Sequence, residues 1–314
     1  ISVVSERIRK MTLPSNPFII EVAVSHYRID RPKSEQISVY EPSLIAAREC
    51  LDAGASIIHY HHDWALSREQ QIEQVTRFQR ELRTTHPDAL MYPAPMKGER
   101  LWEINEHVKA LAESGDLNMF SIEMGGVEYA VSDADGLPSS GRKNFAAADF
   151  ADCHELVTFA NEYQAPISFG VYSLGSVYWI REYAARGLIP AGSFIKIWFA
   201  GRYVTGSHLE PQMRFGLAPT ERALDACLEA IGDIDVPWMV SAQGDAILDS
   251  AVAQLALERG GHIRVGIEDV SGASGMSNLE MVEAVKLMAS KVDRTVVSGK
   301  DAKGYLGMKE KVPA

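Results

Sequence analysis

Short runs of apolar residues alternate with amphipathic stretches along most of the chain. The apolar runs are typical of buried strands, and the stretches between them carry apolar residues at helical spacing. The predicted strands lie at residues 18–24, 55–61, 89–92, 117–122, 166–172, 193–199, 238–242 and 262–267. The predicted helices lie at residues 42–53, 67–83, 100–113, 147–163, 175–186, 220–232, 246–259 and 278–289.

This order of elements predicts the fold. Eight strand-then-helix units in about 270 residues predict a (β/α)₈ TIM barrel. We expect a single TIM-barrel domain over residues 1–314, with an N-terminal lead-in at about 1–17 and a C-terminal extension at about 293–314 that caps the barrel or reaches a neighbouring subunit. An open doubly wound sheet is the alternative. That fold usually carries a glycine-rich turn after its first strand, and Ser25-His26-Tyr27-Arg28 is no such turn.

Composition and charge narrow the class of protein. The chain is 46% hydrophobic with a net charge of −11 and a pI of about 5.3, so nucleic acid and anionic membranes are poor partners. No apolar run reaches the roughly 18 residues that a membrane-spanning helix needs, and the N-terminus lacks the apolar core of a signal peptide. Cys50, Cys153 and Cys227 are scattered, which fits reduced thiols and predicts a cytoplasmic protein.

Histidines end the second predicted strand, in the stretch Ser56-Ile57-Ile58-His59-Tyr60-His61-His62-Asp63. Side chains alternate along a strand, so His59 and His61 project to the same face, about 7 Å apart along the backbone. Two imidazoles on one face at the end of a buried strand indicate a divalent metal site. The alternative is a polar strand end that faces solvent.

A second polar cluster ends the eighth strand, where Arg264 is followed by Glu268 and Asp269. Active sites of TIM barrels lie at the C-terminal ends of the strands, and the second and eighth strands both flank the first. Glu268 can therefore face His59 and His61, which gives two imidazoles and one carboxylate with open positions for substrate on zinc or a similar ion. The alternative for Glu268 and Asp269 is a helix cap and a solvated loop.

Other side chains at the same rim are candidates for binding substrate. Arg264 lies four residues before Glu268, which we place on the same strand face; it would pair with Asp269, clamp a substrate carboxylate, or form an ordinary salt bridge inside the barrel. Ser121 and Glu123 end the fourth strand and would supply a hydroxyl and a carboxylate to a substrate, unless they are loop residues.

Three segments together resemble a known family. They are His59-x-His61 after the second strand, Gly125 after the fourth strand, and Gly-Gly-His-Ile-Arg-Val-Gly-Ile-Glu-Asp at 260–269. The pattern resembles the β-keto acid cleavage enzymes, of which the 3-keto-5-aminohexanoate cleavage enzyme of lysine fermentation is the best known. The resemblance covers most of the chain, from about residue 18 to 289, and its last segment is the most specific.

The resemblance implies a zinc-binding (β/α)₈ barrel that forms homotetramers. Such an enzyme converts a β-keto acid and acetyl-CoA into acetoacetate and a new acyl-CoA. Carried over, His59, His61 and Glu268 would be the metal ligands. Arg264 and Asp269 would form the pair that deprotonates and stabilises the substrate. Ser121 would stand where a threonine usually contacts the substrate.

The chain also departs from the family pattern at three places. The family motif His-x-His-x-Arg-Asp here continues His61-His62-Asp63-Trp64, and Pro93 stands where the third strand usually ends in a serine. Arg28 stands where the loop after the first strand usually carries a glutamate. An arginine there predicts an anionic or neutral β-keto acid as substrate, unless Arg28 turns outward or pairs with Asp63.

The sequence therefore favours a metal-dependent enzyme that cleaves a β-keto acid with acetyl-CoA as co-substrate. A second class is a metal-dependent hydrolase or aldolase on the same barrel that does not use CoA, and acetyl-CoA dependence separates the two. A third class is a binding protein that keeps the metal and has lost the chemistry. The presence of both Arg264 and Asp269 argues against it, because binding alone does not need an acid–base pair.

Overall fold

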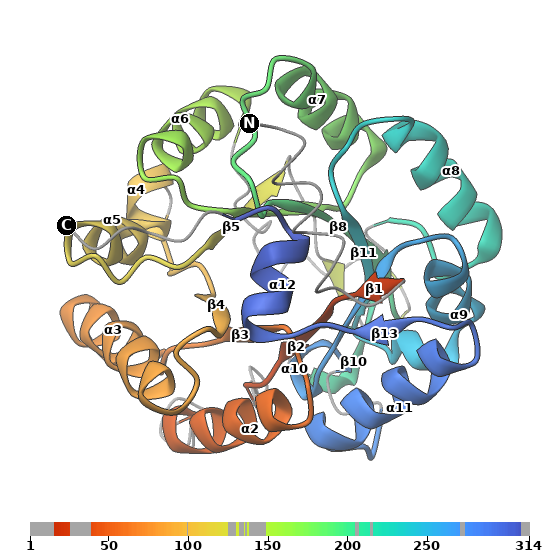
Figure 1. Ribbon diagram of the computed structural model, residues 1–314, viewed down its shortest axis with the longest axis horizontal. Coiled ribbons are helices and arrows are strands. Elements are labelled where there is room, and N and C mark those ends of the chain that lie inside the picture. Colours follow the sequence, from red (N-terminus) through yellow and green to blue (C-terminus); the bar gives the residue numbers. More distant parts are fainter. Residues whose placement is uncertain are drawn as a thin grey trace.

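Eight parallel strands form the wall of a nearly closed barrel in the computed structural model (Figure 1). The structure describes residues 16–25, 39–98, 100–124, 130, 131, 135, 137, 149–204, 207–213, 216–270 and 274–308. The barrel strands are β2 (Ile20–Ala23), β3 (Ile57–Tyr60), β4 (Leu90–Pro93), β5 (Phe120–Met124), β7 (Ile167–Val171), β8 (Phe194–Ala200), β11 (Trp238–Gln243) and β12 (His262–Val265). Hydrogen bonds join them in the order β4-β3-β2-β12-β11-β8-β7-β5. The predicted TIM barrel is confirmed.

The Asn118 side chain bridges the remaining gap, between β4 and the chain just before β5. The backbone N–H of Met91 donates a hydrogen bond to its Oδ1 at 3.0 Å, and its amide nitrogen lies 3.5 Å from the carbonyl oxygen of Ala89. A side-chain amide thus stands in for the strand-to-strand hydrogen bonds found elsewhere around the barrel.

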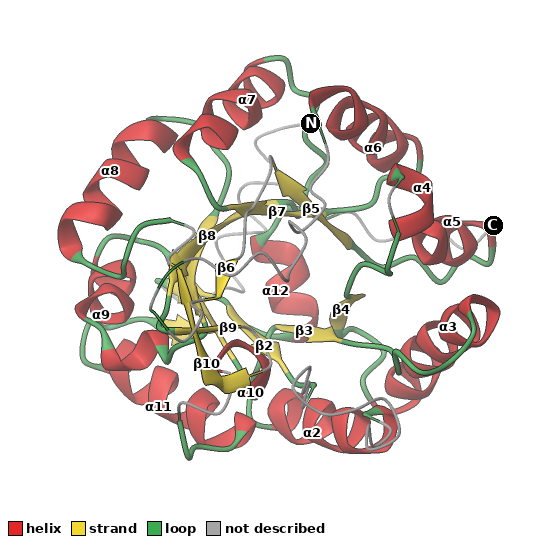
Figure 2. Cartoon of the chain, turned by 180° about the vertical axis from the view of Figure 1, so that it is seen from behind, coloured by secondary structure: helices red, strands yellow, loops and turns green. Residues whose placement is uncertain are grey.

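Helices surround the strands, as both views of the chain show (Figures 1 and 2). They are α2 (Tyr40–Asp52), α3 (Arg68–Thr85), α4 (Leu101–Ile104), α5 (Glu106–Glu113), α6 (Phe150–Glu162), α7 (Leu174–Ala185), α8 (Glu221–Ile231), α9 (Ala251–Glu258) and α11 (Asn278–Ser290). Local sequence fixes their starts: Ser67 and Gln70 form a reciprocal capping box before α3, and Ser277 and Glu280 form another before α11. None of the described helices is both long and apolar enough to cross a membrane.

Two predicted helices differ from the observed ones. The helix predicted at 100–113 is divided at Asn105 into α4 and α5. The helix predicted at 246–259 begins late, because a short 3₁₀ turn, η2 (Ile247–Asp249), precedes α9. The first difference is a break inside the predicted helix and the second is a late start, and apolar residues of both segments still belong to the hydrophobic core.

The N-terminal end of the barrel is closed by the C-terminal segment. The strand β13 (Thr295–Val296) pairs with β1 (Pro17–Phe18), and α12 (Gly299–Tyr305) lies across the barrel opening (Figure 1). The side chains that meet there form an apolar cluster: Ile19, Ile57, Leu90, Tyr92, Met119, Phe194, Met239, Val297, Ala302 and Leu306. Of the two roles expected for the extension, the described part performs the first, capping of the barrel.

Short strands join the two loops that follow β5 and β8. The strand β10 (Ser207–Met213) pairs with β6 (Ala130–Val131) on one side and with β9 (Tyr203–Val204) on the other, and both pairs are antiparallel. Because these loops leave the C-terminal ends of their strands, this small sheet belongs to the end of the barrel where TIM-barrel active sites lie. The hydrophobic pattern of the sequence does not predict it.

The eighth strand ends earlier than predicted. It stops at Val265, and residues 267–270 form a short helix, α10 (Ile267–Val270). Gly266 makes the turn possible: its φ is +149°, and a Cβ there would lie 2.1 Å from the carbonyl oxygen of Ala23. Glu268 therefore does not continue the strand face of Arg264, and the predicted placement of both on one strand is wrong.

Candidate active site

Three side chains converge at the C-terminal end of the barrel, where β3 and α10 meet. The Nε2 atoms of His59 and His61 lie 3.3 Å and 3.1 Å from Oε1 of Glu268. One ligand atom from each residue lies within 4.8 Å of the others, which is the spacing of atoms that share one metal ion. The side chains are 7%, 12% and 7% exposed, so the cluster is shielded from solvent and still reachable.

Each of the three side chains is held by its local structure. The two histidines are two residues apart at the end of β3 and therefore face the same side, as predicted. Ser25 fixes the backbone after the strand, because its hydroxyl accepts a hydrogen bond from the His61 N–H at 2.7 Å. Asn278 fixes α10, because it accepts from the Ile267 N–H at 2.9 Å and donates to the Val24 carbonyl at 3.1 Å.

The protonation of this cluster suits a metal ion. Burial lowers the pKa of His59 to about 4, so its imidazole is neutral at physiological pH, the form that binds metals. Burial alone would raise the pKa of Glu268, but its contacts with His61 and His59 hold it well below the ordinary value. Two imidazole nitrogens and one carboxylate oxygen are ligands that zinc and similar divalent ions accept.

Asp269, beside Glu268 on α10, forms an ion pair with Arg264 of β12. Nε of the arginine lies 2.8 Å from Oδ2 and Nη2 lies 2.7 Å from Oδ1, so the pair is joined at two points. The Ser241 hydroxyl donates a third hydrogen bond to Oδ2 at 2.9 Å. Burial raises the pKa of Asp269, and the Arg264 guanidinium opposes that rise. A raised pKa makes this carboxylate a stronger base than an exposed aspartate.

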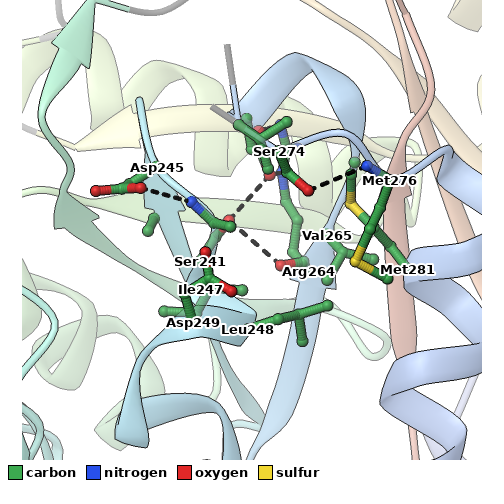
Figure 3. Close-up of a pocket in the computed structure, with 15 residues that line it drawn as sticks. Ser241, Asp245, Ile247, Leu248, Asp249, Arg264, Val265, Ser274, Met276 and Met281 are labelled. Atoms are coloured by element: carbon green, nitrogen blue, oxygen red, sulfur yellow. Dashed lines mark hydrogen bonds and ion pairs between the residues drawn. The ribbon is translucent and has the colours of Figure 1, made fainter. Parts of the chain in front are cut away.

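A small pocket lined by residues of β11, α10 and α11 reaches the Arg264–Asp269 pair. Polar groups of Ser241, Asp245 and Arg264 line one part of it, and the thioethers of Met276 and Met281 line another (Figure 3). Asp245 does not cap α9; it binds Arg202, with Nε and Oδ2 at 2.8 Å. Asp269 is only 3% exposed and lines this mixed apolar and polar space.

Three buried polar residues that sequence reasoning missed lie next to the pair. Glu21 of β2 has its Oε1 at 2.6 Å from the Tyr92 hydroxyl and 2.7 Å from Nη1 of Arg264. Lys196 of β8 donates to the Tyr92 hydroxyl at 2.7 Å, and the Tyr92 ring packs on His59 with 4.7 Å between centroids. A carboxylate and an ammonium inside otherwise apolar strands were the available signal, because buried charges need partners.

The remaining predicted residues lie elsewhere. Ser121 is buried on β5, in register with Ser168 of β7 and two strands away from β3. The partly exposed Glu123 packs over Gly170, where a Cβ would lie 2.0 Å from Oε2, and burial raises its pKa. Arg28 lies outside the described residues. The structure therefore groups the three predicted metal ligands with the predicted catalytic pair. It places Ser121 and Glu123 on β5, where the Glu123 carboxyl group lies near enough to Lys196 and Arg264 for their charges to lower its pKa.

The fold and the site define a class of protein: a TIM barrel with a two-histidine, one-carboxylate cluster and an arginine–aspartate pair at the C-terminal end of its strands. The model of the β-keto acid cleavage enzyme family matches residues 17–308. The chain therefore belongs to the β-keto acid cleavage enzyme family. No curated protein matches the sequence.

Solved structures of the protein ObcA share the fold. Its ternary complex with a C4-CoA adduct and oxalate has a TM-score of 0.60 and 13% sequence identity, covering 85% of this chain and 66% of that one. The binary complex of ObcA with oxaloacetate has a TM-score of 0.60, 14% identity and coverages of 87% and 67%. This chain thus spans about two thirds of the length of ObcA, and at such identity the likeness shows the fold alone.

Proposed function

We propose that this protein is a metal-dependent enzyme that cleaves a β-keto acid with acetyl-CoA as co-substrate, giving acetoacetate and a new acyl-CoA. The observation that carries the proposal is the convergence of His59, His61 and Glu268 directly beside the Arg264–Asp269 pair. A Lewis-acid site adjacent to a carboxylate base is what removal of a proton next to a carbonyl group requires. Membership of the β-keto acid cleavage enzyme family supports the same reaction.

The donor set fits one divalent ion, which we propose to be zinc. Two imidazole nitrogens and a carboxylate oxygen leave open coordination positions for a substrate. The ion would supply Lewis-acid chemistry, polarising the keto and carboxylate oxygens of the β-keto acid. His59 and His61 would bind the ion from the end of β3, and Glu268 would bind it from α10 and offset part of its charge.

Asp269 is the proposed general base. It takes a proton from the carbon between the keto and carboxylate groups, and the carbanion attacks the thioester carbonyl of acetyl-CoA, releasing the CoA thiolate. The thiolate then attacks the original keto carbon, the carbon–carbon bond breaks, and acetoacetate takes the proton back from Asp269. Arg264 stabilises the carboxylate form of Asp269 and fixes its direction through the two-point contact.

We propose an anionic or neutral β-keto acid as substrate, with a second carboxylate as the favoured distal group. Arg28, at the family's glutamate position, would repel an ammonium group and match a carboxylate. Two ObcA complexes support this proposal. One contains oxaloacetate, a keto dicarboxylate, which fits an anionic substrate, and the other contains a C4-CoA adduct, which fits the use of CoA. Ser121 and Glu123 are proposed to contact the substrate from β5.

The proposed assembly is a homotetramer of single-domain subunits in the cytoplasm, as the family resemblance and the scattered cysteines predict. Light scattering of the purified protein tests the subunit number.

The test of the function has two arms. Purified protein is analysed for bound metals, and the metal-loaded and metal-stripped forms are incubated with a panel of β-keto acids, with and without acetyl-CoA. The proposal predicts turnover only with both metal and acetyl-CoA. Metal-dependent turnover without acetyl-CoA would identify a hydrolase or aldolase instead, and metal binding without any turnover would identify a binding protein.

A further inference from the structure

Glu21 is a carboxylate buried completely inside the barrel, beneath the candidate metal ligands. Its Oε1 accepts hydrogen bonds from the Tyr92 hydroxyl at 2.6 Å and from Nη1 of Arg264 at 2.7 Å, and Nζ of Lys196 lies 3.4 Å from the same oxygen. Among the described residues its Oε2 has no hydrogen-bond partner, so every contact passes through one oxygen. Burial alone would raise the pKa of Glu21, but Lys196 and Arg264 lower it to about 2, which keeps the carboxylate charged.

Arg264 is fully engaged by protein groups. A guanidinium carries five N–H donors: one on Nε and two on each terminal nitrogen. Nε and Nη2 contact Asp269, and Nη2 also lies 3.2 Å from Glu268. Nη1 contacts Glu21 at 2.7 Å and the Tyr92 hydroxyl at 3.4 Å. The five contacts to acceptor atoms equal the five N–H donors, so no N–H remains for a substrate carboxylate. Arg264 therefore acts on the reaction through Asp269.

The direction of Arg264 is fixed from three sides. Asp269 binds the Nε–Nη2 edge of the guanidinium, and Glu21 binds Nη1. The Trp198 ring covers its face, with Cζ 4.8 Å from the ring centroid. Without the contact to Glu21, Nη1 would face no carboxylate, and the guanidinium would be free to turn toward Glu268. Such a turn would exchange the two-point contact with Asp269 for a contact with a candidate metal ligand.

We infer that Glu21 is a positioning residue that orients Arg264 and, through it, the base Asp269, and that Tyr92 and Lys196 hold Glu21 in place. The inference rests on the proposed function for its kinetic consequence and on the contacts alone for its structural consequence. Lys196 supplies the charge that makes a buried carboxylate tolerable, and Tyr92 supplies the hydrogen bond that directs Oε1 toward Arg264.

Two variants test the inference at different strengths. Glu21→Gln keeps the shape of the side chain and removes its charge, and we expect kcat to fall about 10- to 100-fold, as for a lost charged hydrogen bond, with KM changed by less than about threefold. Tyr92→Phe removes the hydroxyl that donates to Glu21 and accepts from Lys196, but it leaves the charges of Glu21, Lys196 and Arg264 in place, so we expect about a three- to tenfold loss of kcat. If Glu21→Gln does not fold, Tyr92→Phe carries the test.

A double-mutant cycle shows whether Glu21 acts through the Arg264–Asp269 pair. In an Asp269→Asn background, Glu21→Gln should lower the remaining kcat by less than about threefold, because the base that it positions is already absent. If the loss of kcat in the double variant equals the product of the losses in the two single variants, the inference is overturned. A rise in KM at unchanged kcat would also overturn it, and would mean that Glu21 or Lys196 helps to bind the substrate.

The matched control is Ser168→Ala, which removes a hydroxyl 3.3 Å from the other side of the Tyr92 hydroxyl. The kcat of this variant should stay within about twofold of the wild-type value, since Ser168 forms no hydrogen bond with the charged groups of Glu21 or Arg264. An equal loss in Ser168→Ala and Glu21→Gln would show a general effect of disturbing the barrel interior and would overturn the inference.

A crystal structure of Glu21→Gln decides the question even if the wild-type protein turns over no β-keto acid. We expect the Arg264 guanidinium to rotate, breaking at least one of the contacts of 2.8 Å and 2.7 Å to Asp269. A guanidinium that stays in place would overturn the inference. Absent turnover in the wild type, by contrast, would count only against the proposed function.

Discussion

Arg264 and Asp269 are five residues apart and are joined by two hydrogen bonds, from Nε to Oδ2 at 2.8 Å and from Nη2 to Oδ1 at 2.7 Å. The turn at Gly266 and the start of α10 make this possible, because they fold the chain back so that the aspartate meets the arginine of the preceding strand. The same turn places Glu268 beside His59 and His61. One local change of direction therefore brings together the proposed base and the proposed third metal ligand.

The first prediction concerns the metal ligands. His61→Ala removes one of the three proposed ligand atoms, and we expect the bound metal per subunit to fall at least tenfold after dialysis, measured by elemental analysis. The control is His62→Gln, because the His62 ring packs on Trp64, with 4.3 Å between centroids, and lies outside the three-residue cluster. Equal metal content in wild type and His61→Ala would remove His61 from the site.

The second prediction concerns the base. Asp269→Asn should keep the metal and lose turnover by about 100-fold or more, the usual contribution of a general base. Elemental analysis and the thermal unfolding midpoint check that the variant is loaded and folded. The same substitution at Asp235, which precedes β11 at the opposite end of the barrel, should leave kcat unchanged. Normal turnover by Asp269→Asn would make Asp269 a structural residue.

The third prediction concerns stability and pH. Asp116 accepts hydrogen bonds from Arg80 at 2.7 Å, Arg83 at 3.2 Å and Ser114 at 2.8 Å, tying α3 to the segment before β5. Burial would raise its pKa, but these contacts hold it below the ordinary value. We expect Asp116→Asn to lower the free energy of unfolding by about 1–3 kcal/mol at neutral pH.

The sign of the Asp116 pH dependence follows from its lowered pKa. The pKa of Asp116 is lower in the folded state than in the unfolded state, so the charged carboxylate stabilises the fold. This stabilisation is complete at pH values above the unfolded-state pKa of about 3.9, and it is lost as the pH falls through the folded-state pKa. The difference in unfolding free energy between wild type and Asp116→Asn should therefore shrink between about pH 5 and pH 3. Chemical denaturation across this range measures it, and a constant difference would assign the stabilisation to something other than the charge.

The fourth prediction concerns substrate charge. Wild type should favour a β-keto dicarboxylate over a 5-amino-3-keto acid in kcat/KM. Arg28→Glu should lower the value for the dicarboxylate about ten- to hundredfold, or about 1.5–3 kcal/mol, through loss of a charge-assisted contact. Arg259→Glu makes the same charge change on a surface ion pair with Glu221 and Asp225 and serves as the control. An unchanged substrate ratio in Arg28→Glu would refute the charge argument.

The barrel was predictable because its signals repeat. Alternating apolar and amphipathic runs specify strand and helix at each of the eight units, and the period of two along β3 places His59 and His61 on one face. The helix α10 was not predictable, since four residues are too few to show a helical period. Its omission led to the wrong strand placement of Glu268, although the predicted convergence with the histidines holds.

The buried network around Glu21 shows what a single sequence leaves out. A charge inside an apolar strand indicates that a partner exists, as for Glu21 in β2 and Lys196 in β8. It does not identify the partner, because strands far apart in the chain, here β2, β4, β8 and β12, meet only after the barrel closes. The same limit applies to Ser25 and Asn278, which hold β3 and α10 from other elements.

The most direct test of the central claim follows the carbon atoms of acetyl-CoA. Metal-loaded protein is incubated with its best β-keto acid and with acetyl-CoA that carries a heavy isotope in the acetyl carbonyl. We predict label in the keto carbon of acetoacetate, an unlabelled new acyl-CoA, neither product from metal-stripped protein, and at least about 100-fold less of both from Asp269→Asn. Cleavage of the β-keto acid with the label remaining in acetyl-CoA would contradict this prediction.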